Sequence, residues 1–354
     1  MTDALPTGSR VGILGGGQLG RMLSVAASRL GMTTHIFEPG ANPPAAHVAD
    51  KVTQAGYDDL AALEAFARSV DVVTYEFENV ELSAVDVLEP IVPVRPGRRA
   101  LEVAQDRIAE KEFLAGMGLR PAPFRNVSSL DDLREAIAEI GTPAILKTRR
   151  FGYDGKGQAR IKSAEDAAGA WEAVNGAPSV LEGFVDFDRE ISVIAARSLA
   201  GEVSAYDPGE NVHRDGILHT TTVPANISAS LAQDAVLTAG RVLNALDYVG
   251  VIGVEMFATN QGLIVNEFAP RVHNSGHWTQ DACLTDQFEN HIRAVCGWPL
   301  GDGQRHSNAE MLNLLGDDVF TAPALTGAAV HLYGKAEARP GRKMGHVNRI
   351  TPRT

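Results

Sequence analysis

The spacing of hydrophobic and polar positions changes at about residue 95. Short apolar runs at 11–15, 34–38 and 71–77 alternate with segments of helical period. The first helical segment carries its apolar side chains on one face, at Leu19, Met22, Leu23, Ala26 and Leu30. A second helix is expected at 58–68 and a short strand near Val92–Val94. This alternation predicts a small doubly wound α/β unit with a parallel sheet.

From Arg98 the pattern becomes mixed and then rich in strands. Helices are expected at 98–116, 129–140, 163–174, 228–247 and 285–296. Strands are expected at 142–150, 178–184, 189–198, 203–206 and 216–223, and mostly short strands at 306–350. Ser129, followed three residues later by Asp132, forms a capping box at the start of one helix. The pattern therefore predicts an α+β region followed by a β-rich one.

One predicted hairpin, at 251–268, carries two acidic residues inside apolar strands. Asn260, Gln261 and Gly262 form its tip, and Glu255 and Glu267 each lie six residues from Gln261. A register symmetric about Gln261 sets the two carboxylates opposite each other, where like charges destabilise a sheet. A cation between them would remove that cost, and oxygen ligands of this kind suggest Mg²⁺. The alternative is a pair of edge glutamates that face solvent.

Asn266 offers a third oxygen beside this pair, but its side chain alternates to the other face unless the strand is bulged. A polar loop at 269–279 follows immediately. In it Arg271 presents a planar fork for an oxyanion, and His273 and Asn274 can add hydrogen bonds.

Two glycine-rich segments can hold anions. The spacing of Gly15, Gly17 and Gly20, with Glu38 standing 18 residues beyond Gly20, matches a dinucleotide fingerprint. Any phosphate ester could use the same helix start, so NAD is one reading of this turn. The loop 152–158, GYDGKGQ, can lay backbone amides and a lysine over phosphates and close as a lid, whereas a plain hairpin turn is the alternative.

Several single residues are ambiguous from their positions alone. Glu76 and Glu78 stand at the carboxyl end of a strand, where α/β sheets bind ligands, but they could equally be solvated. Lys147 interrupts an apolar run and could simply extend to the surface. His213 lies between two predicted strands and reads as an ordinary loop histidine.

Composition narrows the function classes. The chain has 354 residues and a net charge of −12, which argues against general affinity for nucleic acid or anionic membranes. No apolar run reaches the roughly 20 residues of a membrane span, and the N-terminus does not resemble a signal peptide. Cys283 and Cys296 suggest neither a disulfide framework nor a metal site, so a cytoplasmic location is expected.

Four segments together resemble ATP-grasp ligases, and more narrowly the 5-(carboxyamino)imidazole ribonucleotide synthase family. They are GGGQLGRM, GYDGKGQ, NEFAPRVHNSGHWTQ and RPGRKMGH. The resemblance implies an ATP-grasp fold with an N-terminal Rossmann-like domain at 1–97 and an ATP-grasp domain at 98–298, whose lid subdomain covers about 120–185. A small C-terminal β-rich domain would occupy 299–354. The family usually continues further beyond RPGRKMGH, which leaves the packing of this end open.

The resemblance also implies roles for individual residues. ATP would be held by Arg107, Lys147, Gly152, Tyr153, Asp154, Gly155, Lys156, Gly157, Gln158, Glu182, Gly183, Phe184, Val185, Glu190, His213, Asn266 and Glu267. Glu255 and Glu267 would hold Mg²⁺, with Mn²⁺ as an alternative. The implied catalytic residues are Asp154, Lys156, Arg271, His273 and Asn274. Aminoimidazole ribonucleotide would contact Gln18, Leu19, Glu76, Tyr153, Asp154, Lys335 and Arg342.

The implied chemistry is a carboxylation in purine biosynthesis. Bicarbonate would attack the γ-phosphate of ATP to give carboxyphosphate and ADP, and the released CO₂ would be attacked by the exocyclic amine of the ribonucleotide. Asp154 would orient that amine or take its proton, while the closed lid excludes water. A homodimer that passes its product to a mutase is expected from the family. An NAD-dependent oxidoreductase, a non-catalytic binding module and a formate-using transformylase remain the alternatives.

Overall fold

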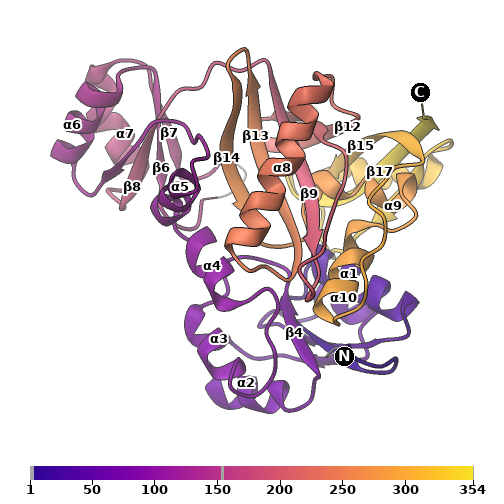
Figure 1. Cartoon of the computed structure of the whole chain (residues 1–354). Coiled ribbons are helices and arrows are strands. Elements are labelled where there is room, and N and C mark those ends of the chain that lie inside the picture. Colours follow the sequence, from indigo (N-terminus) through magenta and orange to yellow (C-terminus); the bar gives the residue numbers. More distant parts are fainter. Residues whose placement is uncertain (1–3, 153–154, 354) are drawn as a thin grey trace.

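A computed structural model describes residues 4–152 and 155–353, and within these ranges the strands form three sheets (Figure 1). The N-terminal sheet lies at the bottom of the view, a small sheet with two helices at the upper left, and a large twisted sheet in the middle and right. In the described part of the chain, no helix is long and apolar enough to cross a membrane.

The N-terminal unit is a four-stranded parallel sheet in the order β3-β2-β1-β4, as the alternating pattern predicts. Its elements are β1 (Arg10–Leu14), α1 (Gln18–Arg29), β2 (Thr33–Phe37), η1 (Pro44–His47), β3 (Lys51–Thr53), α2 (Leu60–Ala67), β4 (Val72–Tyr75) and α3 (Leu82–Leu88). The expected strand near Val92–Val94 is reduced to a single parallel bridge from Val94 to Val73. The carboxyl ends of β1 and β4 are therefore adjacent.

The single helix expected at 98–116 is wrong: two helices meet there, α4 (Arg98–Ala104) and α5 (Arg107–Gly116). Asp106 leaves the helical conformation, with φ −127° and ψ 116°, and its carboxylate accepts hydrogen bonds from the amides of Ile108 and Ala109. An aspartate at this position is a strong helix start signal. The break turns Arg107 into the first residue of α5, where its side chain enters the site described below.

A four-stranded antiparallel sheet in the order β5-β8-β6-β7 forms the small unit at the upper left of Figure 1. It contains β5 (Phe124–Val127), α6 (Leu130–Ile140), β6 (Ala144–Thr148), β7 (Gln158–Ile161), η2 (Ala164–Asp166), α7 (Ala167–Ala173) and β8 (Ser179–Gly183). The predicted N-cap of α6 is confirmed, because the amide of Asp132 donates to the Ser129 hydroxyl. One face of the sheet and the helices enclose a separate apolar core.

The central sheet has nine strands, eight of them in the order β14-β13-β9-β11-β12-β15-β17-β16, with β10 paired to β9. Its strands are β9 (Arg189–Arg197), β10 (Val203–Ala205), β11 (Gly209–Arg214), β12 (Ile217–Val223), β13 (Gly250–Thr259), β14 (Gly262–Ala269), β15 (Ser307–Leu315), β16 (Ala329–Leu332) and β17 (Lys343–Pro352). The accompanying helices are α8 (Ala229–Ala245), η3 (Asn274–Gly276), α9 (Thr279–Ala282), α10 (Gln287–Val295), η4 (Gly316–Phe320) and η5 (Ala322–Ala324).

Alternation along β9 decides which face of this sheet is free for chemistry. Ile191, Val193 and Ala195 pack with α8 in one core cluster. On the opposite face Ser192 and its neighbour Glu190 are polar, and Ile194 joins a second core cluster that includes residues of the N-terminal unit. The face of the sheet opposite α8 is thus polar at one end.

Two further expectations are corrected in this sheet. Residue 213 was expected in a loop, but His213 belongs to β11, whose bulge at Val212/His213 lets the strand continue to Arg214. The strands after 306 were expected to be mostly short, yet β15 has nine residues and β17 ten. Because β15 pairs with β12, the sheet continues without interruption across residue 299.

Candidate active site

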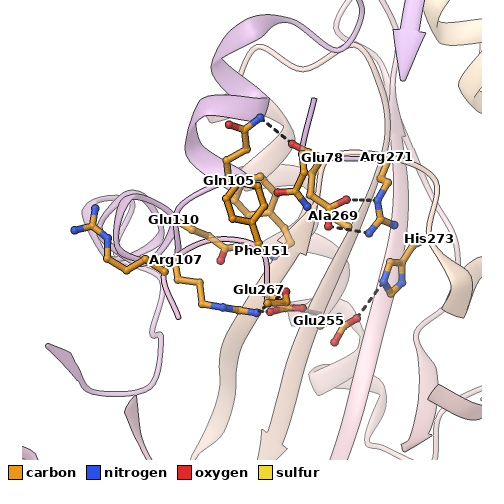
Figure 2. A pocket seen from close by; sticks show the side chains of 15 residues that line it. Glu78, Gln105, Arg107, Glu110, Phe151, Glu255, Glu267, Ala269, Arg271 and His273 are labelled. Carbon is orange, nitrogen blue, oxygen red and sulfur yellow. Dashed lines mark hydrogen bonds and ion pairs between the residues drawn. The ribbon is translucent and has the colours of Figure 1, made fainter. Parts of the chain in front are cut away.

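A pocket opens where the hairpin β13–β14, the break between α4 and α5, and the loop after β4 meet (Figure 2). It is lined by Glu78, Asn79, Ala104, Gln105, Arg107, Glu110, Arg149, Phe151, Gly152, Glu255, Glu267, Phe268, Ala269, Arg271 and His273. Six of the residues expected from the sequence, Arg107, Gly152, Glu255, Glu267, Arg271 and His273, therefore come together in one place. They come from segments that are far apart in the chain.

The acidic pair is opposite as predicted, but for a reason that the sequence did not reveal. The hairpin turns through two residues, with Thr259 paired to Gly262, so the expected symmetry about Gln261 is wrong near the tip. A continuous ladder from that turn would set Glu255 opposite Asn266. Instead the register shifts by one between Glu255 and Met256, Asn266 becomes the extra residue of a bulge, and Glu255 pairs with Glu267.

Each acid of this pair has a basic side chain in contact with it in the structure. Arg107 Nη1 lies 2.6 Å from Glu267 Oε2, and His273 Nε2 lies 3.1 Å from Glu255 Oε1. Burial alone would raise the pKa of Glu267, but Arg107 first and Lys147 next lower that pKa to about 2. The carboxylate is therefore ionised at neutral pH and can serve as a ligand for a cation.

Arg271 is held in the same pocket by a carboxylate that was only an open candidate in the sequence. Its Nε and Nη2 donate to the two oxygens of Glu78, and Nη1 donates to the carbonyl of Val272 at 3.2 Å. The pKa of Glu78 is lowered, because the charge and hydrogen bonds of Arg271 outweigh burial. A bidentate pair of this kind fixes the guanidinium plane. The position of Glu78 after β4 was the signal that pointed to it.

Lys147 and Glu182 meet beside the pocket together with Lys111, which sequence reasoning did not select. Glu182 is 4% exposed; its Oε2 accepts a hydrogen bond from Lys147 Nζ at 3.0 Å, and its Oε1 forms an ion pair with Lys111 Nζ at 3.1 Å. Lys111 also donates to the carbonyl of Asn266 at 3.4 Å, which ties this cluster to the bulge. Its spacing of four from Arg107 places both on one face of α5, and that spacing is the signal that could have found it.

Glu110 is a second buried acid that the sequence did not reveal. It is 2% exposed and accepts a hydrogen bond of 2.6 Å from the amide of Phe268. Burial, and then the charge of Glu267, raise its pKa to about 8. At neutral pH the protonated form therefore predominates, and this form supports the first residues after the bulge.

We expect Glu110→Gln to remove a pH-dependent loss of stability. The folded protein retains this proton up to about pH 8, whereas the ordinary value is 4.5, so the stabilisation is fully present below pH 4.5 and lost as pH rises through about 8. The thermal midpoint of the variant should match that of the wild type at pH 5 and exceed it by about 3–10 °C at pH 9. Glu112→Gln, an exposed position on the same helix, is the control. Parallel pH profiles for all three proteins would contradict the assignment.

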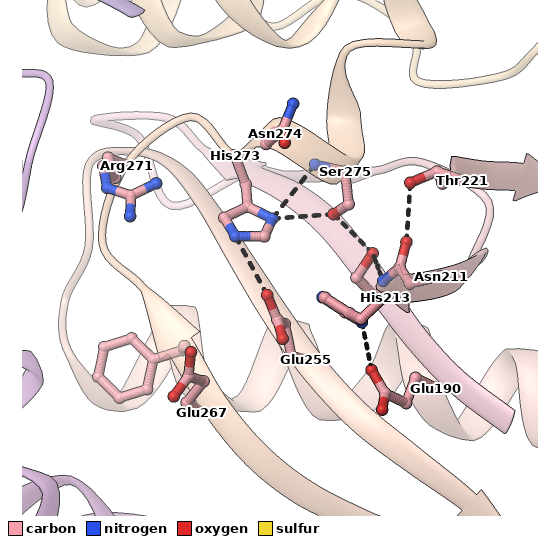
Figure 3. A network of polar contacts seen from close by, with 12 residues as sticks. Glu190, Asn211, His213, Thr221, Glu255, Glu267, Arg271, His273, Asn274 and Ser275 are labelled. Carbon is pink, nitrogen blue, oxygen red and sulfur yellow. Dashed lines mark hydrogen bonds and ion pairs between the residues drawn. The ribbon is translucent and has the colours of Figure 1, made fainter. Parts of the chain in front are cut away.

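Glu190 and His213 form a dyad on the polar face of the central sheet (Figure 3). His213 Nδ1 lies 2.6 Å from Glu190 Oε2, and although burial lowers the pKa of His213, the hydrogen bond and charge of Glu190 raise it.

Residues 182–185 span the end of β8. There Gly183 allows the side chains of Ile140 and Pro123 to pack closely, and the guanidinium carbon of Arg160 lies 4.7 Å from the centre of the Phe184 ring. Their proposed contacts with nucleotide stay predictions.

The glycine turn after β1 already holds anions, and they are the chain's own carboxylates. Glu76 accepts from the amides of Gly17 and Gly20, the latter at 2.6 Å, and Glu38 accepts from the amide of Gly16 at 2.8 Å. These three amides are engaged by carboxylates in the structure, and the expectation that this turn holds a phosphate stays a prediction. Burial raises the pKa of Glu76, and the two amide hydrogen bonds oppose that rise.

The other expected ribonucleotide contacts lie around the start of α1 and the loop before β17. Gln18 is the first residue of α1, and Leu19 is buried in the core cluster that includes Tyr333. Lys335 lies 5.8 Å from the centre of the Tyr333 ring and donates to the carbonyl of Lys343 at 2.7 Å. Arg342 Nη1 donates to the carbonyl of Glu337. None of these four lines the pocket of Figure 2.

The glycine-rich loop begins against Arg107 and then packs on the neighbouring strands. The carbonyl of Gly152 accepts from Arg107 Nη2 at 3.4 Å. Gly155 and Gly157 adopt φ values of +76° and +70°, and a Cβ on Gly157 would stand 2.6 Å from the Thr148 hydroxyl. Lys156 is exposed, and Gln158 opens β7. The predictions for Tyr153 and Asp154 lie outside the described residues.

Asn274 is held away from the acidic pair (Figure 3). Its side-chain amide exchanges two hydrogen bonds with that of Asn313, at 3.0 and 2.8 Å. Asn313 is buried, so the amide pair belongs to the seam between η3 and β15. A direct contact from this side chain to a bound anion stays a prediction.

The donor set fits a metal that shares its coordination with a ligand. Within residues 4–152 and 155–353 no group of three or more His, Cys, Asp or Glu side chains could hold a metal ion by itself. Two facing carboxylates and the bulged Asn266 are nonetheless oxygen donors suited to Mg²⁺, which commonly completes its shell with water and phosphate oxygens.

Family models cover most of the chain. The ribonucleotide synthetase preATP-grasp domain matches residues 9–105, the ATP-grasp domain 112–288, and the phosphoribosylaminoimidazole carboxylase C-terminal domain 309–354. The N5-carboxyaminoimidazole ribonucleotide synthase of Brucella melitensis is 55% identical over 357 residues, covering 99% of both chains. The enzyme of the same name from Bacillus subtilis is 41% identical, covering 96% of this chain and 91% of the relative.

Solved structures agree along nearly the whole length. An ADP complex of an N5-carboxyaminoimidazole ribonucleotide synthetase superposes with a TM-score of 0.96 at 44% identity, covering 99% of this chain and 94% of that one. The synthase of Aspergillus clavatus in complex with ADP and 5-aminoimidazole ribonucleotide gives a TM-score of 0.92 at 32% identity, covering 98% and 94%.

Proposed function

Since the chain belongs to the N5-carboxyaminoimidazole ribonucleotide synthase family of ATP-grasp enzymes, we propose that it is the ligase that uses ATP to carboxylate 5-aminoimidazole ribonucleotide in purine biosynthesis. The product is N5-carboxyaminoimidazole ribonucleotide. The observation that carries this proposal is the meeting of the facing acids Glu255 and Glu267 with Arg107, Arg271 and His273 in one pocket. Such a site can hold polyphosphate and a small oxyanion together.

The proposed reaction has two steps. An oxygen of bicarbonate attacks the γ-phosphorus of ATP, the bond to the β-phosphate oxygen breaks, and carboxyphosphate and ADP result. Carboxyphosphate then breaks down to phosphate and CO₂, and the amine of the ribonucleotide forms a C–N bond to CO₂ and loses a proton. Arg107, Lys147 and Arg271 supply fixed positive charge for the phosphoryl transfer, which depends on positioning and electrostatics.

Glu255 and Glu267 would hold Mg²⁺, with Asn266 beside them and Mn²⁺ as an alternative metal. When bound, the metal neutralises charge on the phosphate oxygens. The contacts of Arg107 and His273 with these acids then have a functional consequence. Arg107 and His273 contact the two acids in the structure, and each would be free to contact anionic groups if the acids held a metal ion. Nucleotide and metal should therefore bind cooperatively.

The ribonucleotide is proposed to bind between the start of α1 and the loop before β17, with Lys335 and Arg342 for its phosphate and Gln18 with Glu76 nearer the sugar. Asp154, outside the described residues, is the proposed partner of the reacting amine. Glu190 and His213 are proposed to hold the nucleotide, and the loop 152–158 to cover it. A homodimer in the cytoplasm, passing its product to a mutase, is part of the same proposal.

ADP release with each substrate omitted in turn tests the function. We expect ADP formation to need both bicarbonate and 5-aminoimidazole ribonucleotide for its full rate, and formate not to replace bicarbonate. Formate-dependent turnover would instead identify a transformylase. NADH formation without ADP would identify an oxidoreductase, and ligand binding without turnover would identify a binding module. The carboxylated product should be identified directly, because it accounts for the bicarbonate consumed.

A further inference from the structure

His273 is fixed in the pocket more firmly than its place in a loop suggests. Its amide donates to Gln287 Oε1 at 2.9 Å, and Gln287 Nε2 returns a hydrogen bond of 2.8 Å to its carbonyl. Gly253 leaves the space for its side chain, because a Cβ there would stand 2.6 Å from His273 Cβ. The imidazole therefore has a defined position, with Nε2 toward Glu255 and Nδ1 toward the interior.

A chain of buried hydrogen bonds leads from Nδ1 back into the central sheet (Figure 3). Nδ1 lies 2.8 Å from the Ser275 hydroxyl, which lies 2.7 Å from the Ser192 hydroxyl. Asn211 Nδ2 donates to Ser192 Oγ at 2.9 Å, and Thr221 Oγ1 donates to Asn211 Oδ1 at 2.8 Å. Ser192, Ser275 and Thr221 are at most 2% exposed and Asn211 is 6% exposed. Water does not compete for these bonds.

The direction of the protons in this chain follows from its chemistry. Ser192 Oγ accepts a hydrogen bond from Asn211, and its single hydroxyl proton is donated to Ser275 Oγ. Ser275 then has its own proton left for Nδ1. The amide of Ser275 also points at Nδ1, at 3.4 Å, and an amide can only donate. Both contacts make Nδ1 an acceptor, so a neutral imidazole carries its proton on Nε2.

We propose that the relay Thr221–Asn211–Ser192–Ser275 is a positioning device that keeps His273 as an Nε2–H donor. This inference rests on the proposed function, in which the pocket receives bicarbonate and carboxyphosphate. With Glu255 turned to a cation, Nε2–H donates to an oxygen of that anion. It follows that an Nε2–H imidazole at His273 donates to the anion and is not the base that takes the proton of the amine.

The tautomer can be read directly by ¹⁵N NMR of the full-length protein labelled at histidine, without any substrate. The signals of His273 are assigned by their loss in His273→Gln. We expect Nδ1 to be unprotonated and Nε2 protonated near pH 8. A protonated Nδ1 in the wild type would overturn the proposal. Because this readout does not involve turnover, it remains decisive whichever substrate the enzyme uses.

Asn211→Asp tests the relay with an almost isosteric change. An aspartate accepts from Ser192, which reverses the direction of both hydroxyl groups and leaves Ser275 as an acceptor facing Nδ1. We expect the Nδ1–H tautomer to become populated and the KM for bicarbonate to rise about tenfold, with the KM for ATP unchanged. Asn226→Asp, at an exposed position, is the matched control and should change neither quantity.

Ser275→Ala is a second variant that tests the relay if Asn211→Asp does not fold. It removes only the hydroxyl, leaving the longer amide contact to Nδ1, so a mixture of tautomers and a smaller rise in the bicarbonate KM are expected. Wild-type NMR signals of His273 in either folded variant would show that the relay does not control the tautomer and would overturn the proposal.

Discussion

Glu267→Gln should lower kcat by about 10²–10³-fold while leaving the fold intact, because it removes a carboxylate charge that Arg107, Lys147 and Lys111 hold ionised. Glutamine keeps the shape and one oxygen, so the bulge and the pairing with Glu255 should persist. The measurement is ADP release at saturating ATP, bicarbonate and ribonucleotide. The expected defect is therefore in charge and not in packing.

The same variant separates the metal role from a general structural one. In the structure, Arg107 Nη1 lies 2.6 Å from Glu267 Oε2. Glutamine weakens this pair, so nucleotide binding in the presence of a chelator should become tighter, while the gain in affinity on adding Mg²⁺ should largely disappear. Glu310→Gln, an exposed strand position paired with Arg349, is the control. Unchanged turnover, or an unchanged Mg²⁺ effect on affinity, would contradict the assignment of Glu267.

The hairpin β13–β14 shows most clearly which features of the site could be predicted from the sequence. The period of two along a strand, together with two acids equidistant from a turn, was enough to predict that Glu255 and Glu267 are opposite each other. The sequence left the bulge at Asn266 open, and it is this bulge that brings Glu255 opposite Glu267 after a two-residue turn. The prediction was correct at the acids although its register was wrong at the tip.

The partners of the predicted residues were harder to foresee than the residues themselves. The roles of Arg107 and Lys147 were expected from the family resemblance, whereas Lys111, Glu110 and Glu78 act through contacts between segments separated by many residues. Such contacts depend on tertiary packing, and local pattern does not encode them. At the glycine turn, by contrast, the local pattern was visible but its partners were not. The dinucleotide-like spacing of the glycines suggested a bound phosphate, whereas in the structure Glu76 and Glu38 accept hydrogen bonds from the amides of the turn.

Arg271→Lys should lower kcat by about 10²-fold or more, although the charge is conserved. The guanidinium has five N–H donors, and the contacts with Glu78 and Val272 use three of them, which leaves two for a bound oxyanion. A lysine ammonium cannot hold both oxygens of Glu78 and present a planar pair of donors at once. We therefore expect slow ADP formation with a nearly normal KM for ATP.

The comparison of Arg271→Lys with Glu78→Gln decides between positioning and charge. If Glu78 acts by orienting Arg271, Glu78→Gln should also slow turnover, and the double variant should be little worse than Arg271→Lys alone. Effects that add fully would mean that the two residues act independently. Arg349→Lys, in an exposed ion pair with Glu310, is the matched control and should retain wild-type turnover. Non-additivity with an intact control would locate the effect in the geometry of the guanidinium, because both single variants leave the other residue in place.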